Sequence, residues 1–399
     1  MIRPLLLAAA LAFLPGPAPA REAYRTTGSC DGFPKLELKT APGLCVGLAA
    51  RGLGFPRGVA VIGNDVYVTD LGARRPGRGR LLRLRNHGRA APEILLSDLD
   101  QPNGIAPGPA GTLYIGLRGR ILRVDPNAPD IGKTARTIAQ GFPTGGLHML
   151  LAFAVAPDGA LLVNVGSATD NCERPGGAPP PNPCPEAASK PPRGAILRIV
   201  PQPFRAVEAR NAEVIATGLR NAMALAFTPQ GELLAATNAR DAIHRVDPSI
   251  PDARLPHDLL VRVRKGGDYG WPYCFDLLRP SPEYPRFSCK TKSPPERRLP
   301  PHSAPLGTIV TRGGLLGPGD HLVLALHGYR ANGHRIVAYA LDAKGRTIDP
   351  FTDIVSGWTP AAGIRPLGAP TALAAAPDGS IYVVEDRNGT LLRIAHSKP

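Results

Sequence analysis

The sequence predicts an all-β protein that folds as a six-bladed β-propeller, in which an N-terminal strand completes the last blade. A unit of short apolar strands separated by Gly- or Asp-containing turns recurs six times along the 399 residues. The composition is also rich in glycine (45 residues) and proline (46 residues), which turns accept and helix interiors exclude. Self-similarity at a regular period is typical of propellers and solenoids, and strand-length apolar runs favour four-stranded blades.

Each repeat begins with a turn that leads into an apolar strand, followed by a second apolar strand and an Arg-flanked third strand. The segment 36–52 precedes the first complete repeat, and a sheet that closes into a ring must protect its edges. We therefore expect 36–52 to supply the outer strand of the sixth blade. The repeats open at 55–61, 101–106, 150–159, 220–231, 303–310 and 370–379.

The first twenty residues have the pattern of a secretory signal peptide. One arginine precedes an apolar run, and Ala18-Pro19-Ala20 forms an A-x-A cleavage site. The run from Leu5 to Leu14 is too short to cross a bilayer, so we expect no integral membrane segment. The interpretation is an exported, periplasmic or secreted protein, with a signal peptide over 1–20 and one propeller domain over 21–399.

The six cysteines fall into three pairs that are close in sequence. An even number of cysteines in an exported chain indicates disulfides, and among the possible connectivities we choose the local one. A metal cluster is the alternative, but no Cys-x-x-Cys motif or nearby histidine supports it. The expected disulfides are Cys30–Cys45, Cys172–Cys184 and Cys274–Cys289.

The chain is basic, with a formal net charge of +15. Its basic residues are dispersed and an exported chain rarely meets nucleic acid, so we expect no nucleic-acid partner. A solvated basic surface is the simplest interpretation. Such a surface also favours an anionic cofactor or an acidic electron-accepting protein.

Blades three to five carry long insertions, at 167–193, 238–257 and 265–302. Propellers build their sites from loops at one end of the central channel, so these blades are expected to form the functional side.

Two of these blades place polar residues where the first strand begins. His148 precedes the strand of blade three, and a histidine combines a near-neutral pKa with a proton-accepting nitrogen. Arg220 and Asn221 open blade four, where the planar guanidinium suits a carboxylate or a developing oxyanion. The alternatives are a structural histidine bonded to a neighbouring loop and an arginine that ties two blades together.

The string KGGDYGWPYC (265–274) offers flat aromatic faces. Tyr269 and Trp271 could stack on a sugar or an aromatic cofactor, or the loop could be a packed rim stapled by Cys274. Blade five brings together His302, His327, Arg330, His334 and Arg335, but no pair of these histidines has a convincing metal-ligand spacing.

Four strings together resemble the soluble, pyrroloquinoline quinone (PQQ)-dependent glucose/sorbosone dehydrogenases. The resemblance spans nearly all of the chain after the signal peptide. It implies a six-bladed propeller that oxidises an aldose or related sugar, either the C1 hydroxyl to a lactone or a sugar aldehyde to an acid, with PQQ and calcium as cofactors. The electron acceptor stays open, with a cytochrome and a quinone as the candidates. The strings are GLRNAMALAFTPQGELLAATNARD (218–241), RKGGDYGWPYC (264–274), HSAPLG (302–307) and APDGSIYVVEDRNGTLLRI (376–394).

The resemblance assigns catalytic roles to two residues. His148, nine residues before Pro157 of a PDG turn, matches the general base that removes the proton of the sugar C1 hydroxyl while hydride passes to the quinone. Arg220 matches the residue that stabilises negative charge on the quinone oxygen, and Asn221 matches its cofactor-binding neighbour.

The resemblance also implies a calcium loop at 238–241. There Asn238 would contact the cofactor, and the backbone carbonyls of Ala239 and Arg240 would bind calcium, which acts as a Lewis acid on the quinone. Leu151 and Ala369 stand where many relatives have arginine.

Three other arginines, Arg330, Arg335 and Arg365, are expected to replace the missing cofactor contacts. Two other function classes stay open: a propeller without the cofactor that only binds a ligand or protein, and a calcium-dependent lactonase-like hydrolase. The hydrolase would need clustered carboxylates at the channel, which the strand openings scarcely offer.

Overall fold

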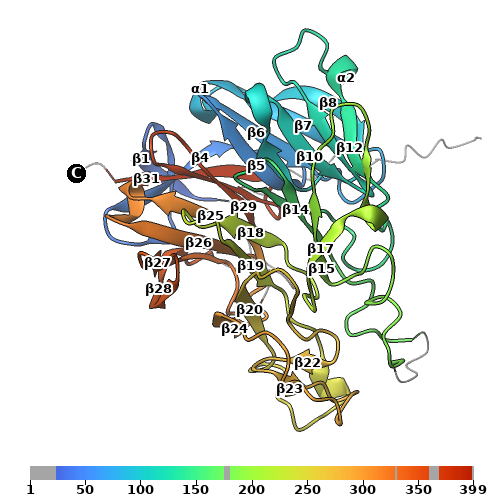
Figure 1. Ribbon diagram of the computed structural model, residues 1–399. Coiled ribbons are helices and arrows are strands. Elements are labelled where there is room, and N and C mark those ends of the chain that lie inside the picture. The colour runs from blue at the N-terminus through green and yellow to red at the C-terminus, as the bar shows by residue number, and fades with distance from the viewer. Residues whose placement is uncertain (1–23, 175–179, 329, 359–367, 398–399) are drawn as a thin grey trace, which may run out of the picture.

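The computed structural model (Figure 1) describes residues 24–174, 180–328, 330–358 and 368–397. The signal peptide expected over 1–20 and Arg365 lie outside these residues. Six sheets form the blades of a β-propeller, which confirms the predicted fold class. No helix in the described part of the chain is both long and apolar enough to cross a membrane, and the two α-helices are single turns, α1 (Arg85–Gly88) and α2 (Ile131–Thr134).

Blades one and two follow the predicted order of antiparallel strands. Blade two gains a short fifth strand, β16, which pairs parallel with its outer strand β12. The strands of blade one are β5 (Pro56–Ile62), β6 (Asp65–Asp70), β7 (Gly79–Leu84) and β8 (Glu93–Leu99), and those of blade two are β9 (Ile105–Pro107), β10 (Leu113–Leu117), β11 (Arg120–Val124), β12 (Arg136–Gln140) and β16 (Val207–Glu208).

Blades three and four form the middle of the chain. The stretch 265–302 is not only an insertion, because it contains β21, which extends blade three, and β24, which is the outer strand of blade four. The strands of blade three are β13 (Phe153–Val155), β14 (Leu161–Val165), β15 (Ala195–Ile199), β17 (Glu213–Thr217) and β21 (Gly267–Asp268), and those of blade four are β18 (Ala224–Phe227), β19 (Leu233–Thr237), β20 (His257–Arg262) and β24 (Arg297–Pro301).

A small hairpin interrupts blade four between its third and fourth strands. It consists of β22 (Cys274–Phe275) and β23 (Arg279–Pro280), and it projects away from the blades at the bottom of Figure 1.

Both ends of the described chain lie in blade six. N-terminal strands form the outer edges of both blade five and blade six. The strands of blade five are β25 (Pro305–Arg312), β26 (Asp320–Leu326), β27 (Arg335–Leu341), β28 (Thr347–Ser356) and β3 (Lys39–Thr40), and those of blade six are β29 (Pro370–Ala375), β30 (Ile381–Glu385), β31 (Thr390–His396), β4 (Leu44–Ala50), β2 (Phe33–Leu36) and β1 (Thr26–Cys30).

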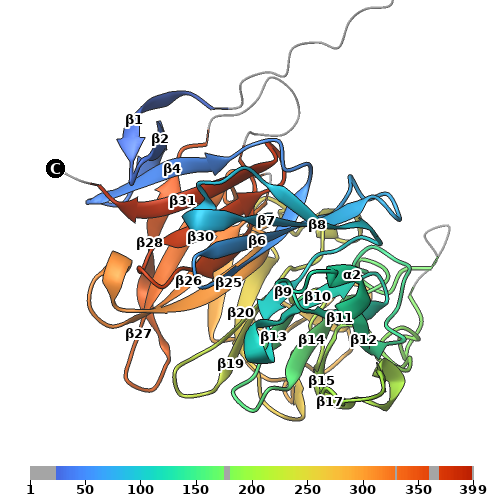
Figure 2. The ribbon, with the colours of Figure 1, turned by 90° about the horizontal axis from the view of Figure 1, so that it is seen from above.

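The ring closes where the N-terminal segment meets the C-terminal strand. β4 pairs antiparallel with β31, with Val46 opposite Ile394, and the two strands lie side by side in Figures 1 and 2. The expectation for 36–52 is therefore confirmed. The structure adds that Thr40 of the same segment pairs with Val355 of blade five, so the segment bridges two blades.

Six apolar clusters lie between neighbouring blades, and each joins one pair around the ring. Strand β14 shows why the strands of the repeats consist mostly of apolar residues. Leu161 and Val163 face the cluster shared with blade two, whereas Leu162 faces the cluster shared with blade four. Both faces of the strand are thus buried, and each fully buried Leu or Val contributes about 1.5–3 kcal/mol to folding.

The three expected disulfides are confirmed. Cys30–Cys45 ties β1 to β4 at the ring closure, and the other two lie in the loops of blades three and four. The second of them, Cys172–Cys184, packs against Trp271. The disulfides therefore hold segments that have little core of their own.

Candidate active site

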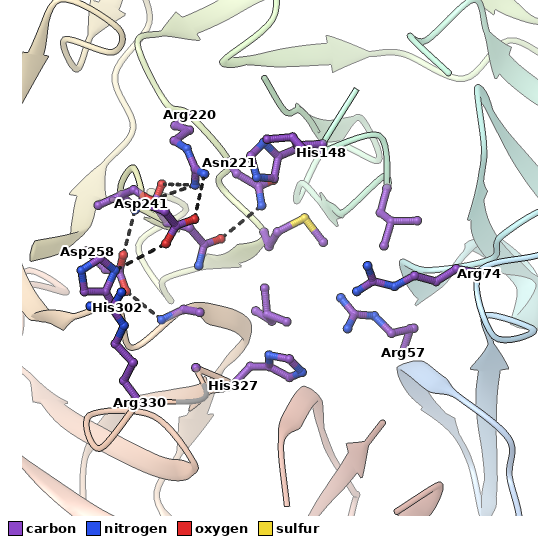
Figure 3. A pocket seen from close by; sticks show the side chains of 18 residues that line it. Arg57, Arg74, His148, Arg220, Asn221, Asp241, Asp258, His302, His327 and Arg330 are labelled. Atoms are coloured by element: carbon purple, nitrogen blue, oxygen red, sulfur yellow. Dashed lines mark hydrogen bonds and ion pairs between the residues drawn. The ribbon is translucent and has the colours of Figure 1, made fainter. Parts of the chain in front are cut away.

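A cavity of about 330 Å³ opens at one end of the propeller (Figure 3). Its walls come from the starts of first strands and the segments before them, from segments that follow second strands, and from Asp258 at the start of the third strand of blade four. In an antiparallel blade these points lie at the same end, so the topology alone brings the segments together. The lining residues are Arg57, Arg74, Leu147, His148, Leu150, Arg220, Asn221, Met223, Asn238, Ala239, Asp241, Asp258, His302, Ala304, Leu306, His327, Gly328 and Arg330.

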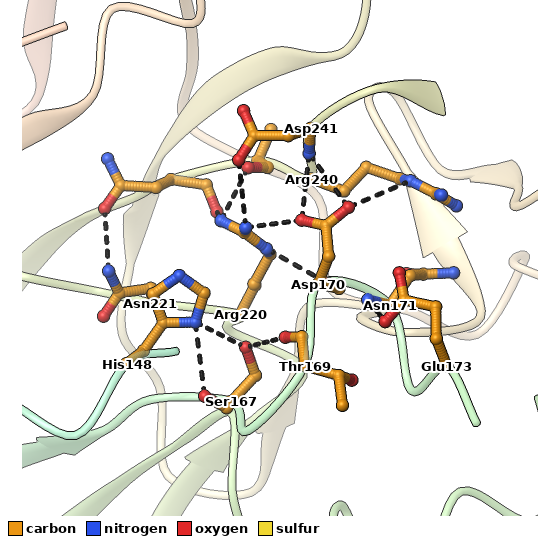
Figure 4. Close-up of polar contacts among 12 residues, drawn as sticks. His148, Ser167, Thr169, Asp170, Asn171, Glu173, Arg220, Asn221, Arg240 and Asp241 are labelled. Atoms are coloured by element: carbon orange, nitrogen blue, oxygen red, sulfur yellow. Dashed lines mark hydrogen bonds and ion pairs between the residues drawn. The ribbon is translucent and has the colours of Figure 1, made fainter. Parts of the chain in front are cut away.

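His148 lies just before β13 and is held by the end of β14. Its Nδ1 is 2.8 Å from Ser167 Oγ, and that hydroxyl donates its own proton to the carbonyl of Thr169 at 2.7 Å (Figure 4). Ser167 Oγ therefore accepts from Nδ1–H, which leaves a lone pair on Nε2. The close approach of His148 to the chain at Ser167 requires a glycine at 166, because a Cβ at this position would lie 2.5 Å from the Cβ of His148.

The surroundings of His148 keep its imidazole neutral. Burial lowers its pKa, and the positive charge of Arg220 adds to the effect, so that the pKa falls to about 3. At neutral pH the side chain is thus unprotonated and able to accept a proton.

Arg220 precedes β18 and is buried, with 5% of its surface exposed. Its guanidinium pairs with the carboxylate of Asp170, and its Nη1 donates to the backbone oxygen of Ala239 at 2.8 Å (Figure 4). Asp170 also accepts the backbone N–H of Asp241 at 2.9 Å. Arg220 thus presents a fixed positive charge beside His148 and also joins the loops of blades three and four.

A row of asparagines continues this wall. Asn164 Nδ2 donates to Asn221 Oδ1 at 3.3 Å, and Asn221 Nδ2 donates to Asn238 Oδ1 at 3.2 Å. Asn238 Nδ2 is buried and has no hydrogen-bond partner among the residues that the structure describes. An unpaired buried donor is costly, so this group favours a ligand with an acceptor oxygen. We call His148, Arg220, Asn221 and Asn238 the His148 wall.

Blade one forms another part of the cavity with Arg57 and Arg74, which we call the blade-one wall. Sequence reasoning missed both residues. Arg57 stands at the opening of the first strand of its blade, as His148 and Arg220 stand at the openings of theirs, so comparison of the repeats could have found it. Arg57 Nη1 contacts Asp386 at 2.8 Å, and the other oxygen of Asp386 lies 3.0 Å from His327 Nε2.

The blade-five side of the cavity holds Arg330 and His302. Arg330 pairs with Asp252 at 2.7 Å. Burial lowers the pKa of His302, but contacts with Asp241 and Asp252 outweigh it and raise the pKa above its usual value. Carboxylates are therefore more common around this cavity than the sequence suggested, because several stand in loops rather than at strand openings.

In the described part of the chain, the cavity residues form no cluster with metal-ligand spacing. The only such group there is Cys172, Cys184 and Glu186, and its sulfurs form a disulfide.

Several residues expected at the site lie away from the cavity. Tyr269 donates its hydroxyl proton to the Arg262 carbonyl at 2.5 Å, and Trp271 donates to the Asp170 carbonyl at 3.0 Å. Both are buried, as the packed-rim alternative predicts.

Two arginines of the expected cofactor and calcium sites also point elsewhere. The side chain of Arg240 pairs with Glu283 at 2.6 Å. Arg335 begins β27, where it donates to the Asn332 carbonyl at 3.1 Å and lies over the ring of Phe351.

Solved structures with the same architecture were found by comparison. The holo form of the pyranose dehydrogenase PQQ domain from Coprinopsis cinerea is 18% identical and has a TM-score of 0.72, with 92% of this chain and 99% of that chain covered. This chain has the same fold. The calcium structure of a Trichoderma reesei family AA12 carbohydrate-active enzyme is 19% identical with a TM-score of 0.72, covering 90% and 97% of the two chains.

A third solved structure is the PQQ-bound aldose sugar dehydrogenase from Streptomyces coelicolor. It is 17% identical with a TM-score of 0.62, and 90% of this chain and 100% of that chain are covered. No protein-family model and no curated protein matches the sequence. The resemblance read from the sequence is confirmed in these structural neighbours, and at this identity they establish the fold alone.

Proposed function

We propose that this protein is a PQQ-dependent sugar dehydrogenase that oxidises the C1 hydroxyl of an aldose or related sugar to a lactone. The observation that carries the proposal is the state of His148. Its Nδ1–H is fixed by Ser167, its Nε2 holds a lone pair, and its pKa is lowered to about 3. A general base must be unprotonated and within reach of the proton it removes, and His148 is an unprotonated imidazole at the wall of the cavity.

The cavity suits PQQ by size, charge and an unsatisfied donor. Its volume of about 330 Å³ lies within the range of small-molecule sites. Arg220 and Arg330 line it on the sides of blades four and five, which suits an anionic cofactor with three carboxylates. Asn238 Nδ2 lacks a partner among the described residues, and a quinone or carboxylate oxygen would satisfy it.

Calcium fits less well at the expected carbonyls. Of the two expected carbonyls, Ala239 and Arg240, that of Ala239 already accepts Arg220 Nη1 at 2.8 Å, and the neighbouring carbonyl of Asn238 accepts the same group at 3.4 Å. A cation at these oxygens would face the guanidinium charge. The side chains as they stand therefore do not form a calcium site there, and we derive no step through calcium.

In the proposed reaction His148 Nε2 accepts the proton of the C1 hydroxyl as the C1–H bond breaks. Bound PQQ, which Arg220, Asn221 and Asn238 would hold, would supply the two-electron acceptor for the hydride of C1. Ser167 keeps the imidazole in the correct tautomer throughout. Arg220, held by Asp170, places its charge beside the site and favours a developing negative charge on an oxygen.

We extend the proposal to location and partners. Three disulfides suit an exported protein, and the single domain over 21–399 remains a prediction. The substrate is a sugar. A cytochrome or a quinone would reoxidise the cofactor, and the basic charge of the chain favours an acidic acceptor protein.

A second candidate function is ligand binding without catalysis. The observation in its favour is that Arg220 already contacts Asp170, Asp241 and the Ala239 carbonyl, so its guanidinium is largely engaged.

Reconstitution separates the two candidates. Purified protein is mixed with PQQ, with and without calcium, and is assayed for bound quinone absorbance and for sugar-dependent dye reduction. A dehydrogenase takes up the quinone and reduces the dye. Absence of quinone uptake at micromolar concentrations contradicts the proposal and favours the binding module.

A further inference from the structure

Blade one brings two arginines to the cavity that holds His148. Figure 3 shows Arg57 and Arg74 extending into it from the same side, across from Arg220 and Asp241. In a six-bladed ring the first and fourth blades face each other. The blade-one wall therefore lies opposite the part of the His148 wall that is suited to the quinone.

Arg57 is a rigidly held cation. It is 6% exposed, and its Nη1 and Nε contact Asp386 at 2.8 Å and Asn103 at 3.3 Å. Its Nη2 makes no hydrogen bond among the described residues. Asp386 also contacts His327, which holds its carboxylate in place. The carboxylate in turn orients the guanidinium of Arg57 so that Nη2 is left for a ligand.

Arg74 occupies the loop after β6, at the mouth of the cavity. The loop backbone is fixed because Gln101 Nε2 donates to the Arg74 carbonyl at 2.8 Å. Of the described charged residues that line the cavity, four are arginines and two are aspartates. The lining is thus cationic, although Asp386, Asp170 and Asp252 pair with three of these arginines from outside it, and blade one contributes no carboxylate to it.

We propose that the sugar oxidised at this site carries a carboxylate, as a uronic acid does, and that Arg57 and Arg74 bind it. This inference rests on the proposed function. With the quinone against Arg220 and Asn238, and C1 of the sugar at His148, the far end of the sugar lies toward blade one. Arginine binds carboxylates through paired N–H groups, and such charge-assisted bonds are about twice as strong as neutral ones.

The test compares galacturonate with galactose, which differ in the carboxylate at C6. For quinone-loaded protein we expect kcat/KM for galacturonate to exceed that for galactose by about tenfold or more. Arg74→Gln and Arg57→Gln should lower this ratio about tenfold, mainly through KM. Arg75→Gln is the matched control, since Arg75 is an exposed neighbour outside the cavity and its variant should keep the ratio.

Quinone uptake and thermal unfolding are measured for each variant. If Arg57→Gln does not fold, Arg74→Gln on its exposed loop still provides the test. A ratio near one in the wild type, or a ratio that neither variant changes, overturns the inference while the proposed function stands. Weaker quinone uptake in the variants, together with an unchanged ratio of the two kcat/KM values, also overturns the inference, because the arginines would then hold the cofactor.

Calorimetry of galacturonate with the protein without added quinone gives a second readout. It separates this inference from the proposed function, because it does not depend on turnover. Binding that Arg74→Gln abolishes and Arg75→Gln keeps supports the carboxylate site even if no quinone is taken up. Absence of binding in both quinone-free and quinone-loaded wild-type protein overturns it.

Discussion

The two walls of the cavity use arginine in different ways. In the His148 wall, Arg220 pairs with Asp170 and donates to the Ala239 carbonyl, so its charge is compensated and its position is fixed. In the blade-one wall, Arg57 keeps Nη2 without a partner among the described residues, and Arg74 stands at the mouth of the cavity. Arg220 and Arg57 are equally buried, so the difference is in their contacts: an arginine engaged at all three nitrogens can set the field around a base, whereas Arg57, which is engaged at two, can bind a ligand.

The largest expected effect comes from the base itself. His148→Asn removes the proton acceptor, so kcat should fall about 10²–10⁴-fold. Quinone uptake should persist, because Arg220, Asn221 and Asn238 remain. The measurement is steady-state dye reduction beside a quinone titration, with His321→Asn on β26 as the control. A wild-type value of kcat in His148→Asn would contradict the role of His148 as the general base.

Arg220→Ala tests the compensated arginine. The variant removes the nearest cation from the Asp170 carboxylate and leaves Arg240, whose Nε is 3.9 Å away, so the free energy of unfolding should fall by about 3 kcal/mol, and quinone-dependent activity should be lost. Addition of Asp170→Asn should restore part of the stability and none of the activity. Urea unfolding of the single and double variants measures this. Full activity in Arg220→Ala would contradict its role.

Asp386→Asn tests the support of the blade-one wall. Burial opposes ionisation of Asp386, but His327 and Arg57 outweigh it and lower its pKa to about 2. A group with a depressed pKa adds stability above its unfolded-state pKa near 4, and that stability is lost as the pH falls toward 2. At pH 7 the variant should be less stable by about 2 kcal/mol, and the wild-type advantage should shrink below pH 4. An unchanged difference between pH 7 and pH 2.5 would contradict the pairing.

The smallest expected effect is on the pH profile of the wild type. An ordinary histidine base would lose activity as the pH falls through about 6.5. Because the pKa of His148 is lowered to about 3, its unprotonated form should persist, and kcat/KM should not show a histidine titration between pH 7 and pH 5. A single-proton loss of activity with a midpoint near 6.5 would show that the base is not held neutral.

The fold could be predicted from the sequence because the blades repeat. Runs such as Leu161–Val165, which is apolar at four of its five positions, reflect strands buried on both faces, and the count of six units predicted the ring. Strand β24 escaped prediction because Arg297–Pro301 contains two arginines and two prolines and lacks the apolar pattern. Its place at the outer edge of blade four does not require that pattern.

The site was predictable where its residues repeat a position in the blade. His148 and Arg220 were found at strand openings, and Arg57 was available by the same logic. Asp170 and Asp386 were not, because a carboxylate in a loop carries no local signal of the arginine it will meet. Tyr269 and Trp271 looked available from sequence, yet their hydroxyl and indole groups satisfy backbone carbonyls.

The most direct test of the central claim is a single turnover in the absence of oxygen. Protein loaded with PQQ is mixed with sugar deuterated or undeuterated at C1, and the quinone absorbance is followed. The account predicts that the wild type converts quinone to quinol more slowly with the deuterated sugar, and that His148→Asn binds the quinone but scarcely reduces it. An unchanged quinone spectrum in the loaded wild type, with neutral and acidic sugars alike, would contradict the account.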